Sequence, residues 1–212
     1  MYLNDKKTDQ YLYYWLVTMF ILVSSIIVVG GLTRLTDSGL SITEWELFAG
    51  FIPPLSNLEW ENYFSLYKQI PEYKLQNFNM SLEEFKIIFW WEWAHRFLGR
   101  IIGLFFFIPM IYFAFKKGFS KTRSLFFIFF LICFQGFLGW FMVSSGLVNR
   151  VDVSHFRLSL HLVTAFIILS LILWQILNYK YKCEIIEHSI RYKLPSIFVF
   201  IVFLQIIFGA FV

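Results

Sequence analysis

The sequence has little charge and little cysteine. Only 15% of its 212 residues are Asp, Glu, Lys or Arg, and it contains two cysteines. Cys133 lies in an apolar block and Cys183 in a basic loop, so we do not expect a disulfide between them. The net charge of +4 is not gathered into a basic patch with interleaved aromatic residues, which argues against nucleic-acid binding.

Common metal-binding patterns are also missing. No Cys-x-x-Cys and no His-x-x-x-His occurs, so the sequence does not support a zinc site. A di-iron carboxylate bundle would need two Glu-x-x-His motifs and two further glutamates, and only Glu92 with His95 matches. No removable signal peptide or Arg-rich transit peptide is evident before the first apolar block, which favours a bacterial plasma membrane over the mitochondrial inner membrane.

Apolar residues, by contrast, are abundant and fall in long blocks. Hydrophobic residues make up 58% of the chain and aromatic residues 22%. Blocks of this length and composition are typical of helices that cross a bilayer. The sequence therefore predicts an all-α polytopic membrane protein with spans at about 11–29, 87–115, 124–143, 158–178 and 194–212.

The predicted spans fall into two groups. Residues 1–178 are expected to form a four-helix transmembrane bundle with a long polar segment at 31–86. Residues 179–212 hold a basic loop and the fifth span, which we interpret as the first helix of a second bundle because it repeats a Gln-x-x-x-Gly spacing of the third span. The Lys- and Arg-rich loops at 116–123 and 179–193 are expected to be cytoplasmic, which places the N-terminus in the cytoplasm.

The second predicted span opens with a group of ionisable residues. Glu92 and His95 are three residues apart, so they share one face of a helix. Gly99 and Gly103 continue that face at four-residue steps and would leave a groove for a flat ligand such as a porphyrin. Ionisable groups in a membrane helix usually mark a site. The alternative is a glycine face for helix packing, with His95 hydrogen-bonded between helices.

A second histidine is predicted at a similar depth. His161 lies about one turn inside the fourth span, and His95 about two turns inside the second, from the same side of the membrane. Two histidines on neighbouring helices can ligate one haem iron from both faces. The alternative is that each makes an independent polar contact. His155 is expected in a loop, on a different face from His161, and His188 on a solvated surface.

Three arginines are predicted near the outer ends of the spans. Arg34, Arg96 and Arg157 are candidates for binding the two propionates of a haem, because guanidinium groups bind carboxylates in a bidentate fashion. The alternative is that they extend to the membrane interface. Arg96 also lies four residues after Glu92, so the two could pair and orient the end of the helix.

Longer motifs cover nearly the whole chain. They are Gly30-Gly31-Leu32-Thr33-Arg34-Leu35-Thr36-Asp37-Ser38-Gly39-Leu40-Ser41, Pro53-Pro54, Tyr67-Lys68-x-x-Pro71-Glu72-Tyr73, Met80-Ser81-x-x-Glu84-Phe85-Lys86, Trp91-Glu92-Trp93-Ala94-His95-Arg96-x-x-Gly99-Arg100, Gly139-Trp140-x-Met142-Val143-x-Ser145-Gly146-Leu147 and Arg157-Leu158-x-x-His161-Leu162. Together they resemble the haem A synthase family. The absence of cysteine from 31–86 resembles the branch shared by proteobacteria and mitochondria.

The resemblance implies a reaction and a set of roles. The family oxidises the C8 methyl group of haem O to the formyl group of haem A by two successive hydroxylations, and haem A then serves cytochrome oxidase. Carried over, His95 and His161 would hold the substrate haem, and Glu92 would take part in the chemistry. The implied partners are the lipid bilayer, a haem O synthase and an electron donor.

The family pattern extends beyond this sequence. Family members have eight spans in two bundles, and the second bundle holds a haem b cofactor, whereas five spans are predicted here. One interpretation is that a separate chain or another copy of this chain supplies the second bundle. The alternatives are a non-catalytic haem-binding module, an inactive fragment, or a proton-coupled carrier that uses Glu92 and His95.

Overall fold

The structure is a computed structural model that describes residues 2–46, 49–181 and 193–211. All the secondary-structure elements in these ranges are helices. The long helices are α1 (Tyr2–Leu35), α4 (Leu82–Lys117), α5 (Phe119–Asn149) and α6 (His155–Tyr181). The shorter elements are the 3-10 helix η1 (Ala49–Phe51) and the helices α2 (Asn57–Tyr67), α3 (Pro71–Leu75) and α7 (Lys193–Gly209).

The four long helices are each long and apolar enough to cross a membrane, which confirms the predicted all-α polytopic class. They extend beyond the predicted spans. Helix α4, for example, begins at Leu82 because Ser81 and Glu84 form a reciprocal capping box there. The fifth predicted span forms α7, a shorter apolar helix that packs on α6. The cytoplasmic N-terminus and the division into two bundles stay predictions.

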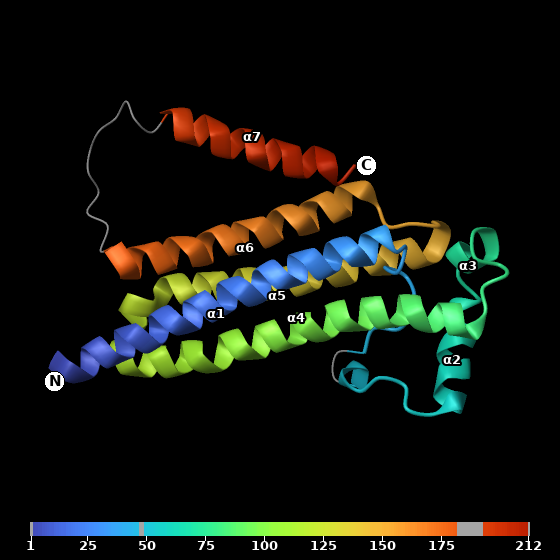
Figure 1. Cartoon of the computed structure of the whole chain (residues 1–212), viewed down its shortest axis with the longest axis horizontal. Helices are drawn as coiled ribbons and strands as arrows, with labels where there is room; N and C mark the ends of the chain where they lie inside the picture. Colours follow the sequence, from blue (N-terminus) through green and yellow to red (C-terminus); the bar gives the residue numbers. More distant parts are fainter. Residues whose placement is uncertain (1, 47–48, 182–192, 212) are drawn as a thin grey trace.

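The four long helices form a bundle in which each helix packs on two neighbours and lies diagonally opposite the third. Helices α1 and α5 each pack against both α4 and α6. In Figure 1, α6 and α4 lie at the top and bottom of the bundle, with α1 and α5 between them. Helices α4 and α6 therefore occupy one diagonal, and α1 and α5 occupy the other. A tight turn joins α4 to α5 at Gly118, whose φ of 87° favours glycine.

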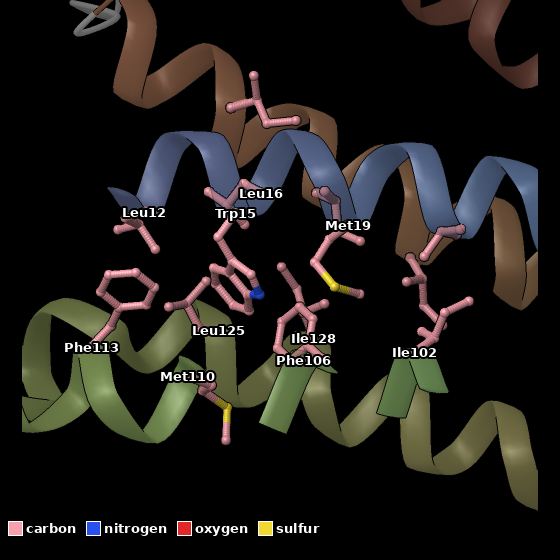
Figure 2. Packing of buried hydrophobic residues seen from close by; sticks show 14 residues of the cluster. Leu12, Trp15, Leu16, Met19, Ile102, Phe106, Met110, Phe113, Leu125 and Ile128 are labelled. Carbon is pink, nitrogen blue, oxygen red and sulfur yellow. The ribbon is translucent and has the colours of Figure 1, made fainter. Parts of the chain in front are cut away.

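Apolar side chains fill the half of the bundle nearest the N-terminus. Figure 2 shows Trp15 of α1 close to Phe106 and Met110 of α4 and to Ile128 of α5. The Trp15 and Phe106 rings lie 4.9 Å apart between centroids. This apolar packing holds the helices together in the half of the bundle that is away from Glu92 and His95.

Pro109 leaves a gap in the hydrogen bonding of α4, and α1 fills it. Proline has no N–H, so the Phe105 carbonyl four residues earlier lacks its usual donor. The indole Nε1–H of Trp15 donates to the Phe105 oxygen at 3.0 Å. An unpaired backbone group is costly in a lipid environment, so Trp15 both packs in the core and stabilises the backbone of α4.

A second cluster of buried residues covers the opposite end of the bundle, here called the α2/α3 end. Helix α2 packs on α4, and α3 packs on α5 (Figure 1). Tyr67 of α2 and Phe85 of α4 are fully buried there, and Leu40 and Ile42 from the segment after α1 belong to the same cluster. The segment after α1 is thereby held against α4, next to Glu92.

Candidate functional site

Glu92 lies at the centre of a buried hydrogen-bond network near the α2/α3 end. It is only 2% exposed. Its Oε2 atom accepts hydrogen bonds from Ser41 Oγ at 2.7 Å and from the Ile42 N–H at 2.8 Å. Its Oε1 atom accepts from Arg96 Nη2 at 2.5 Å. These donors hold the carboxyl group in place, and they join the segment after α1 to α4.

Arg96 and Arg100 bind the backbone of the same segment. They lie one turn apart on α4. Each guanidinium donates to two backbone carbonyls at 2.7 to 3.2 Å, and the acceptors are those of Ile42, Glu44, Glu46 and Gly50. The Glu92–Arg96 pair that the sequence suggested as a structural alternative is therefore present, as part of the contact between this segment and α4.

His95 and His161 lie on opposite sides of the bundle. They come from α4 and α6, the two helices of one diagonal. The His161 Nδ1 atom is buried and has no hydrogen-bond partner among the described residues. Buried polar atoms are nearly always paired, so an unpaired imidazole nitrogen here is consistent with a site that binds a ligand.

A glycine of a neighbouring helix lies beside each imidazole. A Cβ atom added to Gly30 of α1 would lie 3.0 Å from His95 Nε2. A Cβ atom added to Gly139 of α5 would lie 3.3 Å from His161 Cε1. Both distances are shorter than an ordinary carbon contact. The two imidazoles therefore lie directly against bare backbone.

The two glycines predicted to form a groove have other surroundings. A Cβ atom at Gly99 would lie 3.5 Å from Ile26 Cδ1 of α1, which is an ordinary packing distance between helices. A Cβ atom at Gly103 would meet no described atom within 4 Å. The bare backbone nearest His95 is that of Gly30, on a different helix, and the groove at Gly99 and Gly103 stays a prediction.

The two other predicted arginines bind protein groups. Arg34, near the end of α1, donates to Asp152 Oδ1 at 3.0 Å and so joins α1 to the connection between α5 and α6. Arg157 donates to the Phe141 carbonyl at 3.1 Å and lies over the Phe141 ring at 3.9 Å from its centroid. Among the described residues, neither arginine forms a hydrogen bond with Glu92 or Arg96.

The remaining histidines lie apart from this pair or outside the described residues. His155 was expected in a loop, but it is the first residue of α6. The prediction is wrong because helical hydrogen bonding begins early, with the Leu158 N–H donating to the Ser154 carbonyl at 2.9 Å. His188 and Cys183 lie outside the described residues, and Cys133 is a free, exposed cysteine on α5.

Sequence reasoning missed several residues of this region. Gly30 and Gly139 belong to the quoted motifs, and their position next to the two histidines depends on how four helices pack. Ser41 was quoted only as part of a motif, although its hydroxyl group binds Glu92. Glu72, also within a motif, is a buried carboxyl group with no assigned role.

These features define a polytopic helical membrane protein with two histidines on diagonally opposed helices of a bundle and a buried Glu–Arg pair one turn from one of them. The chain belongs to the cytochrome oxidase assembly protein family, whose sequence model matches residues 13–212. The resemblance noted in the sequence is thereby confirmed.

Curated relatives support the same assignment. The chain is 51% identical to a heme A synthase of Pelagibacter ubique over its whole length, which covers 63% of that relative. It is 47% identical to a heme A synthase of Maricaulis maris, with 93% of the chain and 59% of the relative covered. A heme A synthase of Flavobacterium johnsoniae is 44% identical, with 98% and 62% covered. The chain thus spans less than two thirds of these relatives, and no solved structure matches it.

Proposed function

We propose that the chain is the substrate-haem half of a haem A synthase. In this proposal it binds haem O, whose C8 methyl group is oxidised to the formyl group of haem A by two successive hydroxylations, for use in cytochrome oxidase. The observation that carries the proposal is the pair His95 and His161 on diagonally opposed helices, within a chain about half identical to a named heme A synthase.

The residues present fit a haem. His95 and His161 would hold the iron from its two faces. The bare backbone at Gly30 and Gly139 lets each imidazole lie directly against a neighbouring helix, which leaves no side chain of α1 or α5 at these two positions. The bound haem would supply the iron and the macrocycle that carries the reacting methyl group. A haem b cofactor is proposed for a second bundle, which corresponds to the part of the relatives that this chain does not cover.

Glu92 is the proposed catalytic carboxylate. It lies one helical turn before His95, where a carboxylate can exchange a proton or stabilise positive charge at the edge of the porphyrin. Arg34, Arg96 and Arg157 are the proposed propionate anchors. Because each already binds a protein group, a propionate would have to replace or share that group.

The cellular setting is also a proposal. We infer a multi-pass location in a bacterial plasma membrane, as the bacterial relatives and the four apolar helices suggest. A haem O synthase would deliver the substrate and an electron donor would serve the reaction.

A non-catalytic haem-binding module is the second candidate. The observation in its favour is that Glu92 already has a structural role, because Ser41, Ile42 and Arg96 use both of its oxygens. Under this alternative the chain would bind haem between its two histidines and leave the C8 methyl group unchanged.

The ligand assignment is tested by absorbance spectra of the purified chain after haem supplementation. The wild-type protein is expected to show a low-spin bis-histidine spectrum, and His95→Ala and His161→Ala are each expected to convert it to a five-coordinate or haem-free form. His155→Ala is the control and should keep the wild-type spectrum. If the wild type shows no Soret band, or if only His155→Ala loses it, the proposed site is wrong.

The role of Glu92 requires a design that separates chemistry from structure. Glu92→Gln leaves Arg96 without its charge partner, and breaking a buried pair costs about 3–5 kcal/mol. We therefore expect Glu92→Gln to reduce protein yield and pigment, and the double variant Glu92→Gln with Arg96→Gln to recover part of both. Haem O conversion, measured by chromatography with the second bundle supplied, should stay low in the double variant. Recovered conversion would remove Glu92 from the chemistry and favour the haem-binding module.

A further inference from the structure

The glycines beside the imidazoles belong to the two helices that carry neither His95 nor His161. Gly30 lies on α1 and Gly139 on α5, which form the second diagonal of the bundle. Each approaches one imidazole closely enough that an added methyl group would lie within 3.3 Å of it. Both flanking helices therefore lack a side chain at the level of the histidines.

Ligation by two histidines sets the direction of the porphyrin plane. Axial ligands stand on opposite faces of the ring, so the ring plane is perpendicular to the line that joins them. With the ligands on α4 and α6, a ring held in this way would extend towards α1 and α5, the two helices that lie between α4 and α6 in Figure 1. Bulky side chains of α1 or α5 at this level would collide with the ring.

Each glycine is accompanied by a side chain that binds the adjacent histidine helix. Gln135, four residues before Gly139, donates from Nε2 to the His161 carbonyl at 2.9 Å. Thr33, three residues after Gly30, makes a longer contact of 3.4 Å with a carbonyl of α4, one turn before His95. Residues at these spacings share a helix face. The same faces of α1 and α5 thus fix the histidine helices and present bare backbone to the imidazoles.

We propose that Gly30 and Gly139 are positioning residues for a porphyrin between α4 and α6, because the bare backbone at each glycine lets the adjacent imidazole lie against it and so sets the orientation of that ligand. The inference deepens the proposed function and rests on it, since it requires a haem between His95 and His161. It assigns to α1 and α5 a direct part in placing the two imidazoles.

The test compares four alanine variants of the purified chain, titrated with haem b in detergent. In Gly30→Ala and Gly139→Ala the new methyl group would collide with the adjacent imidazole and turn it away from its position, so we expect haem b to bind about tenfold more weakly. The low-spin electron paramagnetic resonance signal should also shift, since it depends on the orientation of the imidazoles. Gly31→Ala and Gly136→Ala are matched controls on the same helices, because their Cβ atoms would meet no described atom within 4 Å.

A stability measurement separates this role from simple helix packing. Alanine forms helices more readily than glycine, and the imidazole beside Gly30 can rotate away. The haem-free Gly30→Ala and Gly139→Ala proteins should therefore melt at the wild-type temperature or above it. The inference is overturned if both bind haem b as tightly as the controls, or if they lose thermal stability and haem together. If the inference is overturned in either way while the wild type shows a normal haem spectrum, the proposed function still stands. A wild-type protein that binds no haem b contradicts both the inference and the proposed function.

Discussion

Glu72 is a buried carboxyl group with no cationic partner in the described part of the chain. It lies on α3 and is only 3% exposed, and its Oε2 atom has no hydrogen-bond partner among the described residues. Burial, followed by the negative charge of Glu92, raises the pKa of Glu72 to about 8, although a hydrogen bond from Tyr67 opposes the shift. Asp37 and Asp152 raise it further. Glu72 is therefore protonated in the folded protein at neutral pH.

This raised pKa predicts that the α2/α3 end loses stability as the pH rises. The unfolded chain releases the Glu72 proton near pH 4.5, whereas the folded chain holds it until about pH 8. Because the folded state binds more protons in this window, its stability falls from pH 4.5 to 8, by an amount on the order of 3–5 kcal/mol. Glu72→Gln, which stays neutral, should remove this slope and melt at a higher temperature than the wild type at pH 8.

Thermal unfolding followed by circular dichroism between pH 5 and 9 checks this expectation. Glu61→Gln, which changes an exposed acid on α2, is the control and should keep the wild-type slope. A Glu72→Gln protein with the same pH dependence as the wild type would show that the Glu72 carboxyl group is ionised in the fold.

For individual residues, the sequence predicts a site when ionisable groups lie at a similar depth in two predicted spans. His95 and His161 could be paired because each is an ionisable group at a countable distance from the end of an apolar block. Gly30 and Gly139 could not be placed beside them, because that requires knowing which helices are neighbours. The same holds for Ser41, whose bond to Glu92 spans 51 positions of sequence.

Among the elements, α1 and α4 are joined by the hydrogen bond between Trp15 and Phe105. We expect Trp15→Phe to keep the ring packing and to leave the Phe105 carbonyl unpaired, at a cost of about 1–3 kcal/mol. Pro109→Ala supplies an N–H that can donate to the same carbonyl, so the double variant should recover much of the loss.

A double-mutant cycle on thermal stability in detergent measures this coupling. Trp174→Phe on α6, whose side chain is 60% exposed, is the control for loss of an indole. Additive effects of Trp15→Phe and Pro109→Ala would mean that the Trp15 indole does not compensate for the proline.

The existence of the long helices could be predicted, whereas their ends could not. Apolar blocks of span length specify α1, α4, α5 and α6 because a membrane requires each block to satisfy its own backbone. The ends depend on local polar groups, such as the capping box that starts α4 at Leu82. The short helices α2 and α3 lie in the segment interpreted only as polar, and their packing on the bundle depends on aromatic contacts between distant residues.

In the whole molecule, the two helices that carry His95 and His161 lie diagonally opposite each other. Helices α4 and α6 pack mainly through α1 and α5, as far as the described residues show. An iron bound by both histidines would join α4 to α6 directly. Under the proposed function, haem binding would then stabilise the folded chain, so that the fraction of folded protein rises with the fraction that holds haem. Chains without haem would open more often across this diagonal, so membrane proteases would remove unloaded protein and spare the loaded form.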